Sequence, residues 1–289
     1  MCNRRRRIKF SLSIMIWIAG LAAAVPAAFA EAGDAPRTPW DKLSLQAGYF
    51  FTTTNTSLRF GSGIGIEIEA EELLGLDTTS DVFRVGGYWR FTKNRRHRLD
   101  LSWFSLNRSG ERVVGQDFVI EDPDGNEIII PAGSRVDAFF NLDIYKAQYS
   151  YSFFQDDRLD LAVVFGLYVM PIEAGFSASG LIDYDLEENF TAPLPVIGLR
   201  NDIALTPKWI ILSGFQVLYL EIDQFEGSIF QANAALEYRP WKHIGLGLGF
   251  DLLHLEVEAD GEEDYPAIDL RGNIEFTYAG LSLYGKIYF

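Results

Sequence analysis

The sequence predicts an all-β protein: a closed, antiparallel, up-and-down transmembrane β-barrel. Three observations lead to this fold class. Apolar and polar residues alternate with a period of two along most of the chain after residue 42, and no segment has a convincing helical period. The apolar rows run for about five residues, which suits a tilted strand that crosses a bilayer in roughly 9–11 residues. The opposite faces carry arginines, acids and glycines, as a wet interior would.

The chain begins with a segment typical of a secretory signal peptide, residues 1–30. A basic stretch is followed by the apolar residues 10–24 and by Ala28-Phe29-Ala30, which fits the A-x-A cleavage pattern. We expect cleavage after Ala30. The domain organisation that follows is a periplasmic linker over 31–42 and a barrel over 43–289.

Charge and cysteine content exclude several classes of function. Residues 1–30 hold five basic and no acidic residues, so the mature chain has 20 basic against 40 acidic residues, a formal charge of −20. An acidic surface argues against nucleic-acid binding. The only cysteine, Cys2, lies in the signal segment. The mature chain is therefore expected to have no disulfide, no thiolate metal site and no cysteine nucleophile.

The first eight predicted strands lie between residues 43 and 222. In the first of them, Leu45, Tyr49 and Phe51 share one face, while Gln46 and Gly48 share the other. Segments written in the same way are 43–52, 64–71, 83–92, 99–103, 145–153, 159–169 and 197–205. Residues 209–222 are apolar on both faces, so they count as one strand whose phase stays unassigned.

The last four predicted strands show the alternation most cleanly. They are 230–239, 244–252, 268–278 and 281–289, with a turn at Ala279–Gly280 between the last two. In 268–278 the apolar residues, such as Phe276, are expected to face lipid and Glu275 to face the interior. Aromatic residues gather near many strand ends, as interfacial girdles require.

These segments give about 12 strands, with ten to fourteen allowed. An even number lets the first strand pair with the last, and lipid tolerates no open sheet edge. With twelve strands and both termini in the periplasm, however, the short connections would face outward. Known barrels have short periplasmic turns and long outer loops. The sequence leaves the sidedness of the loops open.

The final strand resembles the C-terminal strand of Gram-negative outer-membrane proteins. Residues 281–289, Leu-Ser-Leu-Tyr-Gly-Lys-Ile-Tyr-Phe, alternate and end in phenylalanine. The resemblance implies an integral protein of the bacterial outer membrane, in contact with its lipid and recognised by the barrel-assembly machinery during biogenesis. The residues that it assigns to the assembly signal are Leu281, Leu283, Tyr284, Ile287 and Phe289.

The polar faces of the predicted strands define a charged lumen. Its expected members are Glu67, Glu69, Arg84, Arg90, Asp100, Lys146, Arg200, Asp202, Glu237, Arg239, Asp251, Asp269, Arg271, Glu275 and Lys286. Charges inside a barrel persist only when they are paired or wet. Two functions follow: a narrow porin-like channel for small solutes, or a non-conducting structural or ligand-binding barrel.

An enzyme is the third alternative, a lipid hydrolase. Its best candidate residue is His254, which continues the lipid-facing row of Leu252, although a serine would have to come from another strand. His97 and His243 lie in basic turns and are interpreted as solvated or facing lipid headgroups. Residues 122–126 favour a hairpin turn over a calcium loop, because no glutamate stands at the twelfth position. No catalytic residue, metal site or cofactor is predicted.

Overall fold

The computed structural model describes residues 39–60, 68–69, 76–115, 117–121, 127–180, 184–222, 225–260 and 271–289. The predicted signal peptide over 1–30 and most of the linker over 31–42 lie outside the described residues. No helix long and apolar enough to span a membrane occurs in the described part of the chain.

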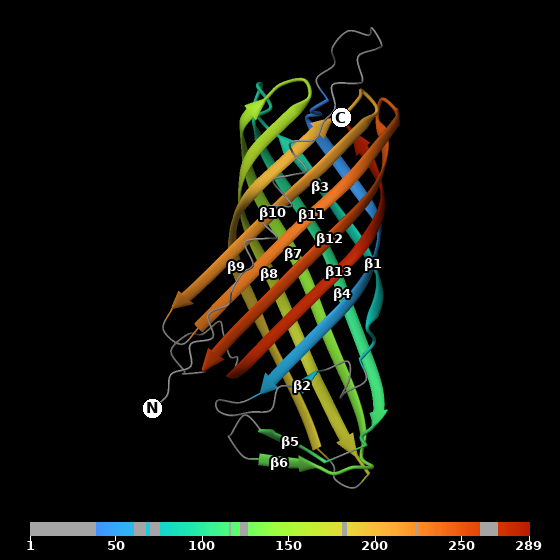
Figure 1. Ribbon diagram of the computed structural model, residues 1–289, viewed down its shortest axis with the longest axis vertical. Helices are drawn as coiled ribbons and strands as arrows, with labels where there is room; N and C mark the ends of the chain where they lie inside the picture. Colours follow the sequence, from blue (N-terminus) through green and yellow to red (C-terminus); the bar gives the residue numbers. More distant parts are fainter. Residues whose placement is uncertain are drawn as a thin grey trace. The chain divides into compact units, whose positions relative to one another are not determined.

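Strands make up almost all of the described structure (Figure 1). In chain order they are β1 (Leu43–Phe60), β2 (Ile68–Glu69), β3 (Thr79–Arg90), β4 (His97–Val113), β5 (Phe118–Glu121), β6 (Glu127–Ile130), β7 (Arg135–Gln155), β8 (Leu159–Ser179), β9 (Tyr184–Ala204), β10 (Trp209–Ile222), β11 (Phe225–Trp241), β12 (Ile244–Asp260) and β13 (Arg271–Tyr288).

Ten of these strands form one closed antiparallel wall. Each wall strand pairs with the next along the chain, and β13 pairs with β1 from Ser44↔Tyr288 to Phe60↔Gly272. Strand β2 pairs only with β1, and β5 and β6 form a separate hairpin. The predicted all-β closed barrel is confirmed. Its strand count is ten, at the lower end of the expected range.

Two segments account for the difference from twelve. The predicted strands 268–278 and 281–289 are one continuous strand, β13, in which Gly280 lies opposite Thr52. A Cβ atom on Gly280 would overlap the carbonyl oxygen of Phe51, so this glycine permits close approach of β1 and makes no turn. Of the predicted strand 64–71, only β2 is described, and it lies outside the closed wall.

The count of ten also resolves the conflict over the connections. All four connections at the end where β1 begins and β13 ends are short: 91–96, 156–158, 205–208 and 242–243. The Lys42 amide donates there to the Phe289 carbonyl at 3.1 Å. The β5–β6 hairpin belongs to the opposite end (Figure 1). The strand termini share their end with short turns alone, whereas the long connections β1–β3, β4–β7 and β12–β13 all lie at the opposite end together with the short connections β8–β9 and β10–β11. Known barrels likewise keep short turns and both termini at the periplasmic side.

The outside of the barrel is predominantly apolar in the half next to the short turns and more polar beyond it. Strand β7 shows the change: Tyr145, Tyr151 and Phe153 point outward and are exposed, whereas Arg135 and Asp137 occupy the same face farther from the turns. We call the outward apolar rows the apolar band. Hydrocarbon surrounds such a band, and the polar rows beyond it belong in water.

The inside of the barrel changes in the opposite sense. On β7 the inward residues Lys146, Ser150 and Ser152 lie level with the apolar band, and Phe140 and Leu142 lie beyond it. A wall surrounded by water must bury its apolar residues inside, whereas a wall surrounded by lipid exposes them. Strand β13 shows the same arrangement beyond the band: Phe276 points inward and is not exposed, and Glu275 lies on the outer face. The predicted orientation of 274–278 is therefore wrong.

Buried side chains, most of them apolar, fill the half of the barrel beyond the band, and the buried Arg108 donates there to the Thr54 hydroxyl at 2.8 Å. The apolar side chains come from nearly every wall strand and form one cluster, in which Phe140 stacks on Phe276 at 5.6 Å between ring centroids. Leu76, Val114 and Ile130 join the cluster from the connections at this end. This half is packed like the core of a water-soluble β-barrel.

Candidate functional site

The interior level with the apolar band is the candidate site, because it gathers charged side chains from eight of the ten wall strands and from the segment before β1. Its layer nearest the apolar core is built around Asp251 of β12. Arg84 Nη1 lies 2.6 Å from Asp251 Oδ2, and Gln231 donates to Asp251 Oδ1 at 2.9 Å. Lys146 Nζ donates in turn to Gln231 Oε1 at 3.0 Å. Each of these four side chains thus has a partner from another strand.

The next layer toward the turns holds three arginines and three aspartates. Arg90 and Arg200 both reach Asp160 Oδ2, at 2.8 and 2.9 Å, and Asp160 is fully buried. Arg98 pairs with Asp100 and lies 3.3 Å from Asp202. Equal numbers of opposite charges make this layer neutral, which is the condition under which buried ions persist.

A third group surrounds Glu237 of β11. Its carboxylate accepts hydrogen bonds from Lys286 at 2.7 Å, from the Tyr284 hydroxyl at 2.9 Å and from the Tyr288 hydroxyl at 2.7 Å. The two tyrosine rings lie over Gly247 and Gly245, where a Cβ atom would collide with them. The alternate glycines of β12 therefore make room for inward tyrosines.

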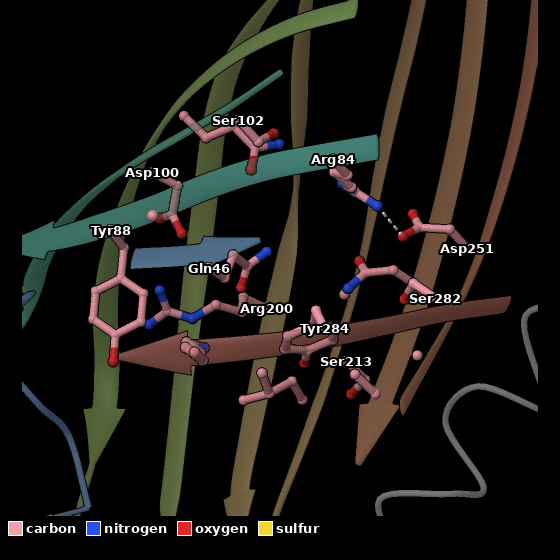
Figure 2. A pocket seen from close by; sticks show the side chains of 18 of the residues that line it. Gln46, Arg84, Tyr88, Asp100, Ser102, Arg200, Ser213, Asp251, Ser282 and Tyr284 are labelled. Atoms are coloured by element: carbon pink, nitrogen blue, oxygen red, sulfur yellow. Dashed lines mark hydrogen bonds and ion pairs between the residues drawn. The ribbon is translucent and has the colours of Figure 1, made fainter. Parts of the chain in front are cut away.

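Between these layers lies a polar cavity of about 180 Å³. Figure 2 shows Arg84, Asp100, Arg200 and Tyr284 around it, with the Arg84–Asp251 pair at one side. Serine, glutamine and asparagine side chains complete the lining. A space of this kind suits a few hydrogen-bonded water molecules, because it is small and polar side chains form about half of its lining.

Packed side chains separate the cavity from the outer end of the barrel. Phe50, Phe104 and Tyr278 form an aromatic layer with ring centroids 5.4 to 6.0 Å apart, and none of the three is exposed. The Arg84 guanidinium lies 5.3 Å from the Phe104 ring centroid on the cavity side. The apolar core continues beyond this layer.

The turn end is covered by residues that the sequence pattern assigns to the linker. Trp40 is 4% exposed, packs with Ala204 and Ile210, and donates from its ring nitrogen to the Asp156 carbonyl at 2.7 Å. Asp41 pairs with Arg239 at 2.6 Å. The linker expectation is wrong for Trp40 and Asp41, because indole burial and this ion pair fix these two residues at the turn end.

Most predicted lumen residues lie inside the barrel. Those with inward, buried or half-buried side chains are Arg84, Arg90, Asp100, Lys146, Arg200, Asp202, Glu237, Arg239, Asp251 and Lys286. Glu275 lies outside instead, with 45% of its side chain exposed. Glu67 and Asp269 fall outside the described residues, as do the side chains of Glu69 and Arg271.

Several members of the network are not predicted from the sequence. Asp160 alternates with Leu159 and Leu161, so the pattern could have placed it inside. Arg98 falls at the end of a predicted turn, yet it shares the inward face of Asp100. No local pattern marks Asp41, because its partner Arg239 lies 198 residues away.

The remaining predicted sites lie on the outer surface. His254 is half-buried there, and its Nδ1 is 2.9 Å from the Thr277 hydroxyl and 3.9 Å from Glu275 Oε1. In the segment that resembles an assembly signal, Leu281, Leu283, Ile287 and Phe289 are exposed on the outer face, while Tyr284 points inward.

Comparison with known proteins identifies the fold. No family model matches the sequence, and no curated protein matches it. The outer membrane protease OmpT from Escherichia coli superposes with a TM-score of 0.51 at 9% identity, over 90% of this chain and 99% of that one. The transport unit of the autotransporter AIDA-I from Escherichia coli gives 0.39 at 8% identity, over 94% and 97%. Ail of Yersinia pestis gives 0.33 at 10% identity, over 84% and 98%. At 9% identity, the likeness to OmpT concerns the fold alone.

Proposed function

We propose that this chain, an integral β-barrel protein of the bacterial outer membrane, is a closed structural barrel that does not conduct solutes. The observation that carries the proposal is that side chains block the interior on both sides of the polar cavity. Ion pairs line the half within the apolar band, mainly apolar side chains together with the buried Arg108 fill the other half, and Trp40 covers the turn end.

A porin-like channel would need a continuous wet path through these layers. An ion that crosses the aromatic layer of Phe50, Phe104 and Tyr278 would lose its hydration and would gain only the Tyr278 hydroxyl as a polar partner there, which is prohibitively costly. Beyond it, the ion would meet further side chains with no exposure. The charges that suggested a lumen from the sequence instead neutralise one another across a narrow interior.

Single-channel recording tests this proposal. Purified protein, refolded and inserted in a planar bilayer, should give no conductance steps under conditions in which a water-filled porin, used as the positive control, gives clear steps. Reproducible steps from folded protein would overturn the proposal and favour the porin-like channel.

We also propose no hydrolytic role for His254, although a hydroxyl does meet it from the next strand. Thr277 and Glu275 both approach Nδ1 of the imidazole. A nucleophile and an orienting carboxylate have to contact opposite ring nitrogens. The arrangement is therefore that of a surface hydrogen bond beside a carboxylate.

A further inference from the structure

The outer wall carries a groove within the apolar band, across strands β1, β3, β4, β7 and β8. Its volume is about 620 Å³, and its lining is almost entirely apolar. Volumes of this order are typical of ligand pockets, roughly 300–1,000 Å³. The groove is independent of the interior and of the proposed closed barrel.

The groove exists because small residues interrupt a row of large ones. Gly87, Leu101, Ala147 and Leu167 lie side by side on neighbouring strands, and Gly87 and Ala147 leave the row shallow. Trp89 stands one row nearer the turns. Trp103, which stacks on Tyr145 at 6.4 Å, stands one row farther away. These aromatic rings bound the groove along the membrane normal.

The turn directly below the groove is basic. Strands β3 and β4 both line the groove and are joined by residues 91–96, which include Lys93 and Arg96. Lys42, next to the groove residue Leu43, is exposed, as is Lys93. Within the described part of the chain, no ion pair involves Lys42, Lys93 or Arg96. Such a basic patch is notable on a chain with 40 acidic and 25 basic residues.

We propose that this groove binds one phospholipid of the periplasmic leaflet, with an acyl chain in the groove and its phosphate against Lys93 and Arg96. Empty space beside apolar side chains forfeits dispersion contacts, and a flexible acyl chain can fill an irregular groove. A phosphate at the turn would receive charge-assisted hydrogen bonds. The wall of a second barrel is convex, so it would contact the rims of the groove and leave its floor empty.

Native mass spectrometry in a mild non-ionic detergent tests the proposal with phosphatidylglycerol as the probe. Wild-type protein should retain one phosphatidylglycerol molecule. Ala147→Trp fills the floor of the groove and should weaken this binding at least about tenfold. The matched control is Ala234→Trp, because Ala234 is likewise exposed and outward, but on β11, away from the groove. The control should bind as the wild type does.

A second pair of variants leaves the wall untouched. Lys93→Gln combined with Arg96→Gln should weaken phosphatidylglycerol binding several-fold, whereas Lys208→Gln, in another turn at the same end, should not. Heat-modified electrophoretic mobility confirms that each variant is folded.

Three results would overturn the proposal. The first is equal binding by the Ala147 and Ala234 variants, or by the Lys93/Arg96 variant and the wild type. The second is retention of lipopolysaccharide in place of phosphatidylglycerol, lost on Ala147→Trp. The third is a dimer that the Ala147 variant abolishes. None of these results bears on conductance.

Discussion

At the scale of single residues, the interior charges matter most where one group serves several partners. Asp160 is such a group, because its carboxylate pairs with both Arg90 and Arg200 and is fully buried. A buried ion pair stabilises a fold little compared with apolar packing. The loss of one partner, however, leaves the other charge buried, unpaired and without water. The network therefore makes each member hard to replace.

Asp160→Ala should lower the free energy of unfolding by about 3–5 kcal/mol, since two guanidinium groups lose a buried partner. Urea unfolding of the protein in phospholipid vesicles measures the change. Glu111→Ala is the control, because Glu111 pairs with Arg135 where both side chains are more than half exposed. It should cost no more than about 1 kcal/mol. Equal costs for the two variants would contradict the account of the network.

At the scale of elements, the seam between β1 and β13 decides whether the barrel closes. Seventeen residue pairs join these strands, and close contact is kept at Gly280 by the absence of a side chain. Gly285 lies on the same strand but faces outward, where an added Cβ would meet nothing within 4 Å. The two glycines thus have different roles.

Gly280→Ala should impair closure, because the new methyl group would displace the backbone of β1, whereas Gly285→Ala should fold normally. The measurement is the folded fraction after refolding into detergent, read from heat-modified electrophoretic mobility. A Gly280 variant that refolds as completely as the Gly285 variant would show that the seam adapts, contrary to this expectation.

At the scale of the whole molecule, the two halves of the barrel have opposite distributions of apolar and charged residues. The half near the short turns exposes apolar residues to lipid and encloses charge, and the other half does the reverse. Strand β4 crosses the boundary: Leu101 and Asn107 are both exposed on its outer face, before and beyond Trp103. The two side chains are therefore both exposed, but Leu101 faces lipid and Asn107 faces water.

Single cysteines distinguish the two surroundings, because the mature chain is expected to lack cysteine. With a membrane-impermeant maleimide on intact cells, Asn107→Cys should be labelled and Leu101→Cys should not. Labelling of Leu101→Cys in intact cells, or failure to label Asn107→Cys, would place the boundary or the sidedness elsewhere.

The sequence alone determined the fold class, because a period of two with apolar rows of bilayer length is typical of strands that cross a membrane. It also placed most charged residues correctly on one side of each strand, as Arg84, Glu237 and Asp251 show. It placed Glu275 wrongly, because alternation reports which residues share a face and cannot report whether that face meets lipid or water.

Only the tertiary structure decided the number of strands, the burial of Trp40 and the pairing of the interior charges. Each depends on contacts between residues far apart in the chain, such as Asp41 with Arg239 or Phe50 with Tyr278. The alternation of neighbouring residues cannot predict which distant residues will be in contact. The width of the barrel decides whether its interior charges surround water or pair with one another. That width depends on the number of strands and on the pairing of β13 with β1.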